Sequence, residues 1–229
     1  MINLLTILKN NYLILKNIFS LNDKKPKFIF FSENKSYLKY SYLLIEFLSK
    51  KFPGEVYYVS SDKNDWIENL NVKNFFIGNG FFLHYFFKST KAKNIFMTST
   101  DLDNSILKKN NYVKNYIYYF HGSVSTSKIY TEEAFDNYDT ILCNGNYHYN
   151  EIRLRENFKN LNKKKLIKSG FFYFDYLNIR KKHFSEKYNE ILVAPSWNKN
   201  KKNYINEDIE KIISQLIKSN FKVRFRPHP

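Results

Sequence analysis

Residues 116–157 read YIYYFHGSVSTSKIYTEEAFDNYDTILCNGNYHYNEIRLREN and decide the fold. The stretch opens with an apolar run, Tyr116–Phe120, that is typical of a buried strand, and a second such run follows at Thr140–Cys143. The second run leads through Asn144-Gly145-Asn146 into a helical pattern near Tyr147–Asn157. Short buried strands that alternate with helices are typical of a parallel sheet with helices on its faces. We therefore expect an α/β fold.

The same alternation extends in both directions along the chain. Before residue 116 we expect strands at 27–31, 55–59, 74–77 and 94–97 and helices at 37–51 and 81–88, and after the quoted stretch a strand at 166–168. The polar, basic segment 178–189 is typical of a linker. After it, strand 190–193, a helix at 207–219 and strand 222–225 form one βαβ unit. Because a lone βαβ unit cannot cover both faces of a sheet, we expect it to dock on the first domain or to begin a longer domain.

Composition limits the classes of function. The 229 residues carry 37 Lys and Arg against 21 Asp and Glu, a net charge of +16, and 43% of them are apolar. A chain so rich in large apolar groups is expected to fold. Its positive charge favours anionic partners, although compositional bias explains part of the excess of Lys and Arg. The lone Cys143 excludes an internal disulfide and fits a reducing cytosol. We expect no cofactor and no specific nucleic-acid partner.

The N-terminal residues 4–19 have the pattern of an amphipathic helix. One side carries Leu5, Leu8, Tyr12, Leu15 and Phe19 at steps of three and four residues. Two interpretations stay open: a helix that lies on a membrane surface, or a helix that packs on the domain. The polar side has only two lysines, Lys9 and Lys16, which is few for a membrane-surface helix. The run is too often interrupted to span a bilayer.

Histidine and hydroxyl side chains follow the predicted strands where ligands bind in open α/β sheets. His121 and Gly122 follow the strand at 116–120, and a histidine in this position is suited to act as a general base. In the second domain, Ser196 and a lysine-rich loop follow strand 190–193, a pattern that suits a phosphate site. Arg226-Pro227-His228-Pro229 follows the last strand.

In this order, these motifs resemble the CDP-glycerol glycerophosphotransferase family, whose enzymes make teichoic-acid-like and related capsular polymers. The matching features are the His121-Gly122 pair, Ser125-Thr126 with Lys128, Cys143-Asn144-Gly145 before a helix, the Ala194-Pro195-Ser196-Trp197 run and the final His-Pro. Gly170-Phe171-Phe172 lacks the proline that the family has in its Gly-x-Pro turn, and Asn198 stands where the family has arginine.

The resemblance implies a glycosyltransferase-B-like enzyme with two Rossmann-like domains. Residues 1–22 would be an N-terminal helix, 23–180 the acceptor domain, and 188–229 the start of an incomplete donor domain. A truncated chain of this kind would be inactive alone. The implied site residues are His121 as catalytic base, Gly122, Ser123 and Lys128 for the acceptor, and Ser196, Lys199, Arg226 and His228 for the donor phosphates.

The implied reaction moves a polyol phosphate, of the glycerol phosphate type, from a CDP-activated donor to a hydroxyl of a cell-envelope or capsular glycan. The acceptor would be a glycan or a lipid-linked glycan, which places the enzyme in the cytoplasm or on the inner face of the cell membrane. Two alternatives remain: a nucleotide-sugar glycosyltransferase of the same architecture, and a non-catalytic basic module that binds polyanions.

The remaining polar residues give weaker indications. His84 lies in an apolar helical pattern and is expected to pack there, and no histidine or cysteine has metal-ligand spacing. Asp101 and Asp103 follow a predicted strand, where they would cap the next helix or bind a metal or the acceptor. We expect capping and no metal.

Overall fold

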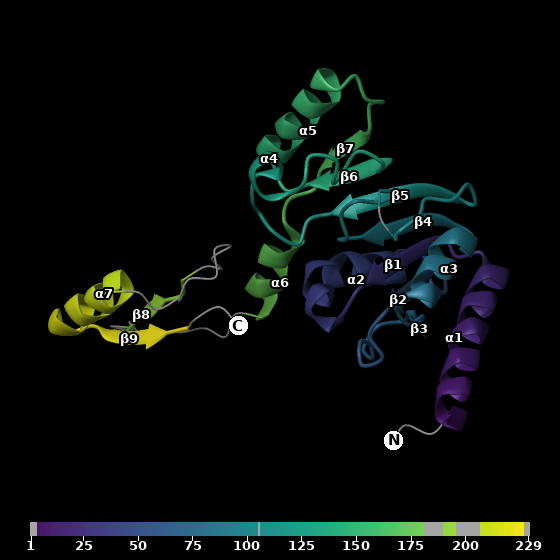
Figure 1. Ribbon diagram of the computed structural model, residues 1–229, viewed down its shortest axis with the longest axis horizontal. Coiled ribbons are helices and arrows are strands. Elements are labelled where there is room, and N and C mark those ends of the chain that lie inside the picture. Colours follow the sequence, from purple (N-terminus) through teal and green to yellow (C-terminus); the bar gives the residue numbers. More distant parts are fainter. Residues whose placement is uncertain (1–3, 105, 181–189, 196–206, 227–229) are drawn as a thin grey trace. The chain divides into compact units, whose positions relative to one another are not determined.

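The structure is a computed structural model that describes residues 4–104, 106–180, 190–195 and 207–226. The chain divides into two compact units, Met1–Arg180 and Lys181–Pro229. The first unit holds a seven-stranded sheet, and the described part of the second unit holds two paired strands and a helix (Figure 1).

In the first unit, the sheet consists of β1 (Phe28–Ser32), β2 (Val56–Ser60), β3 (Lys73–Phe76), β4 (Ala92–Met97), β5 (Val113–Tyr119), β6 (Thr140–Cys143) and β7 (Lys165–Lys168). Its helices are α1 (Leu4–Lys24), the 3₁₀ helix η1 (Lys35–Tyr40), α2 (Tyr42–Lys51), α3 (Phe81–Ser89), α4 (Thr126–Ile129), α5 (Asn146–Phe158) and α6 (Phe172–Arg180). The strand order is β3-β2-β1-β4-β5-β6-β7, and all neighbouring strands are parallel. This is a Rossmann-like arrangement, so the predicted α/β class is confirmed.

Alternation along the strands divides the core into two layers. In β1, Ile29 and Phe31 face a layer that contains residues of α1, α3 and α5, whereas Phe30 faces a layer built with α2 and α6. The side chains of these three strand residues are at most 1% exposed. Burial on both faces explains why the strands are continuous apolar runs rather than alternating ones. Because the seven strands are parallel, their carboxyl ends all lie at one edge of the sheet.

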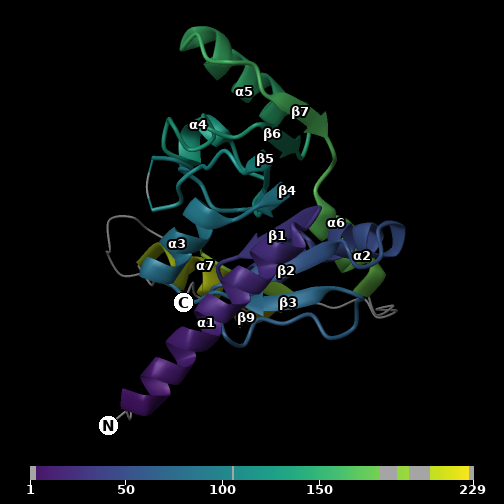
Figure 2. The ribbon, with the colours of Figure 1, turned by 90° about the vertical axis from the view of Figure 1, so that its right-hand side faces the viewer.

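Helix α1 is partly a core element and partly an exposed apolar surface. Ile14, Ile18 and Leu21 are at most 6% exposed and pack in the α3 layer, and Asn17 Nδ2 donates to the Phe76 carbonyl oxygen at 2.9 Å. A Cβ on Gly78 would lie 2.9 Å from Ile14 Cδ1, so the helix approaches the chain closely there. The predicted stripe is exposed at Leu5, Leu8, Tyr12 and Phe19, by 54–70%. The interpretation of a helix that packs on the domain is therefore confirmed for one side of α1, which contacts α3 and β3 (Figure 2). The other side is an exposed apolar surface, and its attachment to a membrane stays a prediction.

Two predicted segments differ from the structure. In place of the single helix expected at 37–51, the structure has η1 followed by α2. The Asn34 side chain accepts a hydrogen bond from Ser36 N at 3.0 Å at the start of η1. At its end, Ser41 N donates to the Leu38 carbonyl oxygen, so a 3₁₀ turn separates the two helices. Helix α6 was not expected, and it includes residues 178–180 of the predicted linker. The remainder of that linker, 181–189, lies outside the described residues.

The second unit contains β8 (Glu190–Val193), α7 (Glu207–Lys218) and β9 (Lys222–Phe225). The two strands pair in parallel, with Glu190 opposite Lys222 and Val193 opposite Phe225. The βαβ unit expected from the sequence is therefore confirmed, and the residues that follow β8 and β9 leave the sheet at the same edge.

Candidate functional site

His121 lies just beyond β5, at the carboxyl edge of the first sheet. The strand order places the end of β1 near it, and the side chains of η1, which follows β1, contact its ring. The ring centroids of Tyr37 and His121 are 5.3 Å apart and perpendicular, and those of Tyr40 and His121 are 6.1 Å apart. Tyr130 contacts the imidazole from a third direction, at 6.4 Å. Three tyrosines therefore surround a half-buried histidine at the edge where ligands bind in such sheets.

The environment of His121 favours the neutral imidazole. Burial lowers its pKa below the ordinary histidine value, and the nearby negative charge of Glu33 acts weakly in the opposite direction. The Nδ1 atom is buried and has no hydrogen-bond partner in the described part of the chain. A neutral imidazole can accept a proton, so the geometry and the electrostatics both suit a general base.

Helix α5 and Asn144, which lies just before it, hold the loop that carries His121. Asn144 Nδ2 donates to the Gly122 carbonyl oxygen at 3.2 Å, and His148 Nε2 donates to the Val124 carbonyl oxygen at 2.8 Å. The Glu151 carboxylate accepts a hydrogen bond from Thr126 N at 2.6 Å. Burial by itself would raise the pKa of this carboxyl, but the hydrogen bonds from Thr126 outweigh the effect of burial and lower the pKa. These contacts fix the backbone after β5, which keeps the imidazole in place.

The predicted acceptor residues lie on this loop or just after it. Ser123 Oγ is 2.7 Å from Tyr147 Oη, and Lys128 is exposed on α4. A Cβ on Gly122 would meet Val124 Cγ2 at 3.8 Å and Tyr130 Oη at 4.0 Å, which are ordinary contacts. The local packing therefore leaves room for a side chain at this position.

The predicted donor residues lie in the second unit, and most are outside the described residues. Ser196, Lys199 and His228 fall there, as does the basic loop. Arg226 lies within the described residues. Its backbone N–H donates to the Val193 carbonyl oxygen at 2.9 Å, and this hydrogen bond links the ends of β8 and β9. Arg224 in β9 pairs with Glu190 of β8, with Nε 2.9 Å from Oε1.

The expectation that Asp101 and Asp103 cap a helix is wrong. Both adopt left-handed backbone conformations, with φ of 61° and 68°, in a turn that no helix follows. Asp101 accepts a hydrogen bond from Thr131 Oγ1 at 2.8 Å, and Asp103 accepts one from Lys109 N at 3.3 Å. Across residues 4–104, 106–180, 190–195 and 207–226, no cluster of three His, Cys, Asp or Glu side chains could hold a metal.

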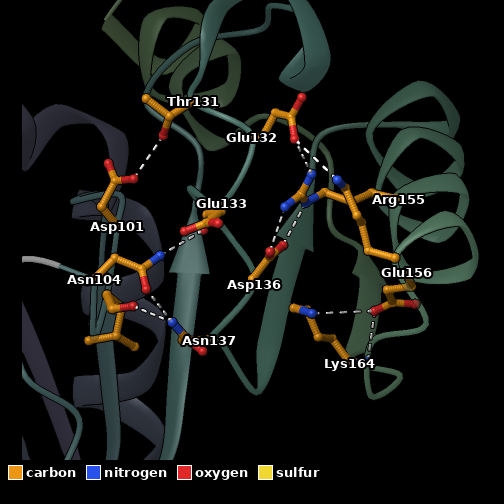
Figure 3. A network of polar contacts seen from close by, with 12 residues as sticks. Asp101, Asn104, Thr131, Glu132, Glu133, Asp136, Asn137, Arg155, Glu156 and Lys164 are labelled. Carbon is orange, nitrogen blue, oxygen red and sulfur yellow. Dashed lines mark hydrogen bonds and ion pairs between the residues drawn. The ribbon is translucent and has the colours of Figure 1, made fainter.

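Figure 3 shows how the loop that follows α4 is held from two sides. On one side Thr131 binds Asp101, and Asn137 Nδ2 donates to the Leu102 carbonyl oxygen at 2.8 Å. On the other side Arg155 of α5 forms two hydrogen bonds with the Asp136 carboxylate, at 2.7 and 2.6 Å. The loops after β4 and β5 are thereby tied to each other and to α5.

The sequence did not indicate several residues of this site. Glu33, Tyr37 and Tyr40 lie more than 80 positions before His121 in the printed sequence and meet it only because β1 and β5 flank β4. The sequence pattern also did not single out His148, which is buried and donates to the Val124 carbonyl oxygen in the loop after His121. The polar residues Glu33 and Asn34 directly after a predicted strand were the available signal.

The pH dependence of His121 follows from these contacts. Because burial lowers its pKa, we expect His121 to titrate below the ordinary histidine value and to be neutral at pH 7. Replacing Glu33 with Gln removes the charge that stabilises the imidazolium, so the pKa falls further. NMR titration of the imidazole in the wild type and in Glu33→Gln measures both values. A pKa above that of free histidine, or a rise in the variant, would contradict this account.

Comparison with known proteins supports the fold. No family model and no curated protein matches the sequence. Solved structures do match: the wall teichoic acid polymerase TagF aligns with 98% of this chain at a TM-score of 0.58 and 13% identity. A TagF variant with one histidine replaced by asparagine, soaked with CDPG, aligns with 97% of it at a TM-score of 0.56.

The chain spans 62% of the length of the first of these structures and 61% of the second. At 13% identity, the likeness is one of fold. The resemblance that the sequence motifs indicated is confirmed at that level, and so is the predicted fold class. The chain therefore has the Rossmann-like, glycosyltransferase-B-like fold of the wall teichoic acid polymerase TagF.

Proposed function

We propose that this protein transfers a polyol phosphate, of the glycerol phosphate type, from a CDP-activated donor to a hydroxyl of a cell-envelope or capsular glycan. The observation that carries the proposal is the half-buried imidazole of His121, surrounded by tyrosines at the carboxyl edge of the sheet. A fold shared with a teichoic acid polymerase supports it. In this reaction His121 accepts the proton of the acceptor hydroxyl, and that hydroxyl supplies a partner for the imidazole.

The first unit would bind the acceptor and the second the donor. Gly122, Ser123 and Lys128 follow the base in sequence and are proposed to contact the acceptor. Ser196, Lys199, Arg226 and His228 are proposed to hold the donor diphosphate and to offset the charge that develops on the leaving nucleotide. The parallel pairing of β8 and β9 supports this assignment, because the ends of both strands, Val193 and Phe225, then lie at one edge of their sheet.

We further propose that the protein works at the inner face of the cell membrane and binds a lipid-linked glycan there. The exposed stripe of α1, formed by Leu5, Leu8, Tyr12 and Phe19, supports surface attachment. In the part of the chain that the structure describes, no helix is long and apolar enough to cross a bilayer.

A donor panel tests the proposed function. The protein expressed from its complete reading frame is incubated with a glycan acceptor and either CDP-glycerol, CDP-ribitol or a UDP-sugar, at two salt concentrations. We expect turnover with a CDP-polyol and none with the UDP-sugar. Turnover with the UDP-sugar alone would establish the glycosyltransferase instead. Binding of any polyanion that weakens steeply with salt, without turnover, would indicate the non-catalytic module.

A further inference from the structure

The 3₁₀ helix η1 has two sides, and the side away from the base lines a hollow of about 450 Å³. Its Tyr37 and Tyr40 contact His121, whereas the lysines of η1 line the hollow. The remaining walls come from α2, the 64–69 loop and α6. Helix α6 contacts both α2 and η1, and Figure 1 shows it beside α2. The cationic and aromatic lining residues are Lys35, Lys39, Tyr42, Trp66, Tyr176 and Arg180.

A row of aromatic rings connects the base with this hollow. From His121 the row passes to Tyr40, whose ring centroid lies 5.0 Å from that of Tyr173. Tyr173 lies 6.2 Å from Tyr176, and Tyr176 lies 5.8 Å from Tyr42 in the wall of the hollow. Flat aromatic surfaces in a row can contact the C–H faces of successive sugar or polyol units, so the row gives a path for an extended ligand.

The charge in the hollow favours an anion. Lys35, Lys39 and Arg180 line it together with one carboxylate, Glu68. Within the described residues, these three cations form no ion pair. Instead, Lys39 Nζ lies 5.1 and 5.3 Å from the rings of Tyr40 and Tyr173, and Arg180 Cζ lies 4.4 Å from the ring of Tyr176. Lys39 and Arg180 are thus held beside the aromatic row, where a phosphate could bind them.

We propose that this hollow is a second binding site, for a phosphate-bearing polyol or sugar unit of an anionic glycan chain. Its volume falls within the roughly 300–1,000 Å³ that is usual for ligand sites. The chain would lie along the aromatic row, with one phosphate on Lys39 and Arg180 and its terminal hydroxyl at His121. The identity of this chain as the acceptor rests on the proposed function, whereas the hollow itself does not.

Trp66 provides a direct measurement of binding at the hollow. The chain has two tryptophans, Trp66 and Trp197, and Trp66 is 41% exposed in the wall. In a Trp197→Phe background, the fluorescence of Trp66 is followed during titration with a short glycerol phosphate oligomer. The double variant Lys39→Met/Arg180→Met removes the proposed phosphate contacts. Its control, Lys93→Met/Lys114→Met, removes the same charge from exposed lysines near the opposite edge of the sheet.

We expect the oligomer to change Trp66 fluorescence and the Lys39/Arg180 variant to bind it about tenfold or more weakly. The Lys93/Lys114 variant should bind like the parent. An uncharged maltooligosaccharide and a single-stranded oligonucleotide should both bind more weakly than the oligomer. The proposal is overturned by an unchanged fluorescence signal, by equal losses in the two variants, or by preference for the oligonucleotide.

The transfer assay separates failure of this site from failure of the proposed function. If oligomer binding depends on Lys39 and Arg180 but no CDP-polyol is turned over, the hollow is a phosphoglycan site and the proposed reaction is wrong. If transfer occurs and neither cation affects oligomer binding, the reaction stands and the hollow is not its acceptor site.

Discussion

Replacing His121 with alanine is expected to lower turnover of the CDP-polyol donor by about 10²–10⁴-fold, the usual contribution of a general acid or base. The physical reason is that the neutral imidazole is the proton acceptor at the carboxyl edge of the sheet, where burial keeps its pKa low. His121→Asn keeps much of the shape of the ring but cannot take up the proton, so the loss should be similar. Steady-state release of nucleotide measures both variants.

The matched control is His84→Ala. His84 lies on α3, and its Nδ1 is 3.1 Å from the Ile106 carbonyl oxygen. Turnover in this variant should stay near that of the wild type, and thermal melting should confirm that all three variants fold. A folded His121 variant with nearly wild-type turnover would remove His121 from the mechanism.

The second large effect concerns α1, whose two sides are expected to respond oppositely. Ile18 is fully buried in the α3 layer, so Ile18→Ala should lower the free energy of unfolding by about 2–5 kcal/mol, the range for core truncations of this size. Leu8, which is 55% exposed on the same helix, should tolerate alanine with little change in stability. Chemical denaturation measures both.

Binding to anionic vesicles should show the reverse order. Leu8→Ala removes apolar area from the exposed stripe and should weaken binding, whereas Ile18→Ala should bind normally at a temperature at which it is folded. If Leu8→Ala binds vesicles like the wild type, the stripe is not a membrane surface. If Ile18→Ala leaves the stability unchanged, α1 is not part of the core.

The strands could be predicted because the sheet is buried on both faces. A strand such as β6 is then buried at every position and mostly apolar, and Thr140–Cys143 was located without error. Helix α6 was missed because its aromatic sequence, Phe172–Arg180, has no clear helical periodicity, and it forms by packing Phe172 against the α2 layer. Which side of α1 packs on the domain could not be predicted either, since both its buried and its exposed side carry apolar residues.

For the site, the sequence could indicate His121 but not its surroundings. A histidine directly after an apolar strand is a local signal, whereas its contacts with Tyr37 and Glu33 depend on the order of β1, β4 and β5 in the sheet. The hydrogen bond between Glu151 and Thr126, which holds the loop after β5, depends on the angle at which α5 crosses that loop. Such contacts arise from tertiary packing, which spacing in one sequence does not encode.

The bond that forms in the reaction tests the central claim most directly. In polyol-phosphate transfer, the acceptor oxygen attacks the phosphorus that carries the polyol, the proton passes to His121, and CMP leaves. In glycosyl transfer, the acceptor attacks carbon and a nucleoside diphosphate leaves. We predict that ³¹P NMR of CDP-glycerol, acceptor glycan and protein will show equal amounts of CMP and a new phosphodiester, and that His121→Ala will slow the appearance of both signals by about 10²–10⁴-fold. Release of CDP without a new phosphodiester would contradict the account.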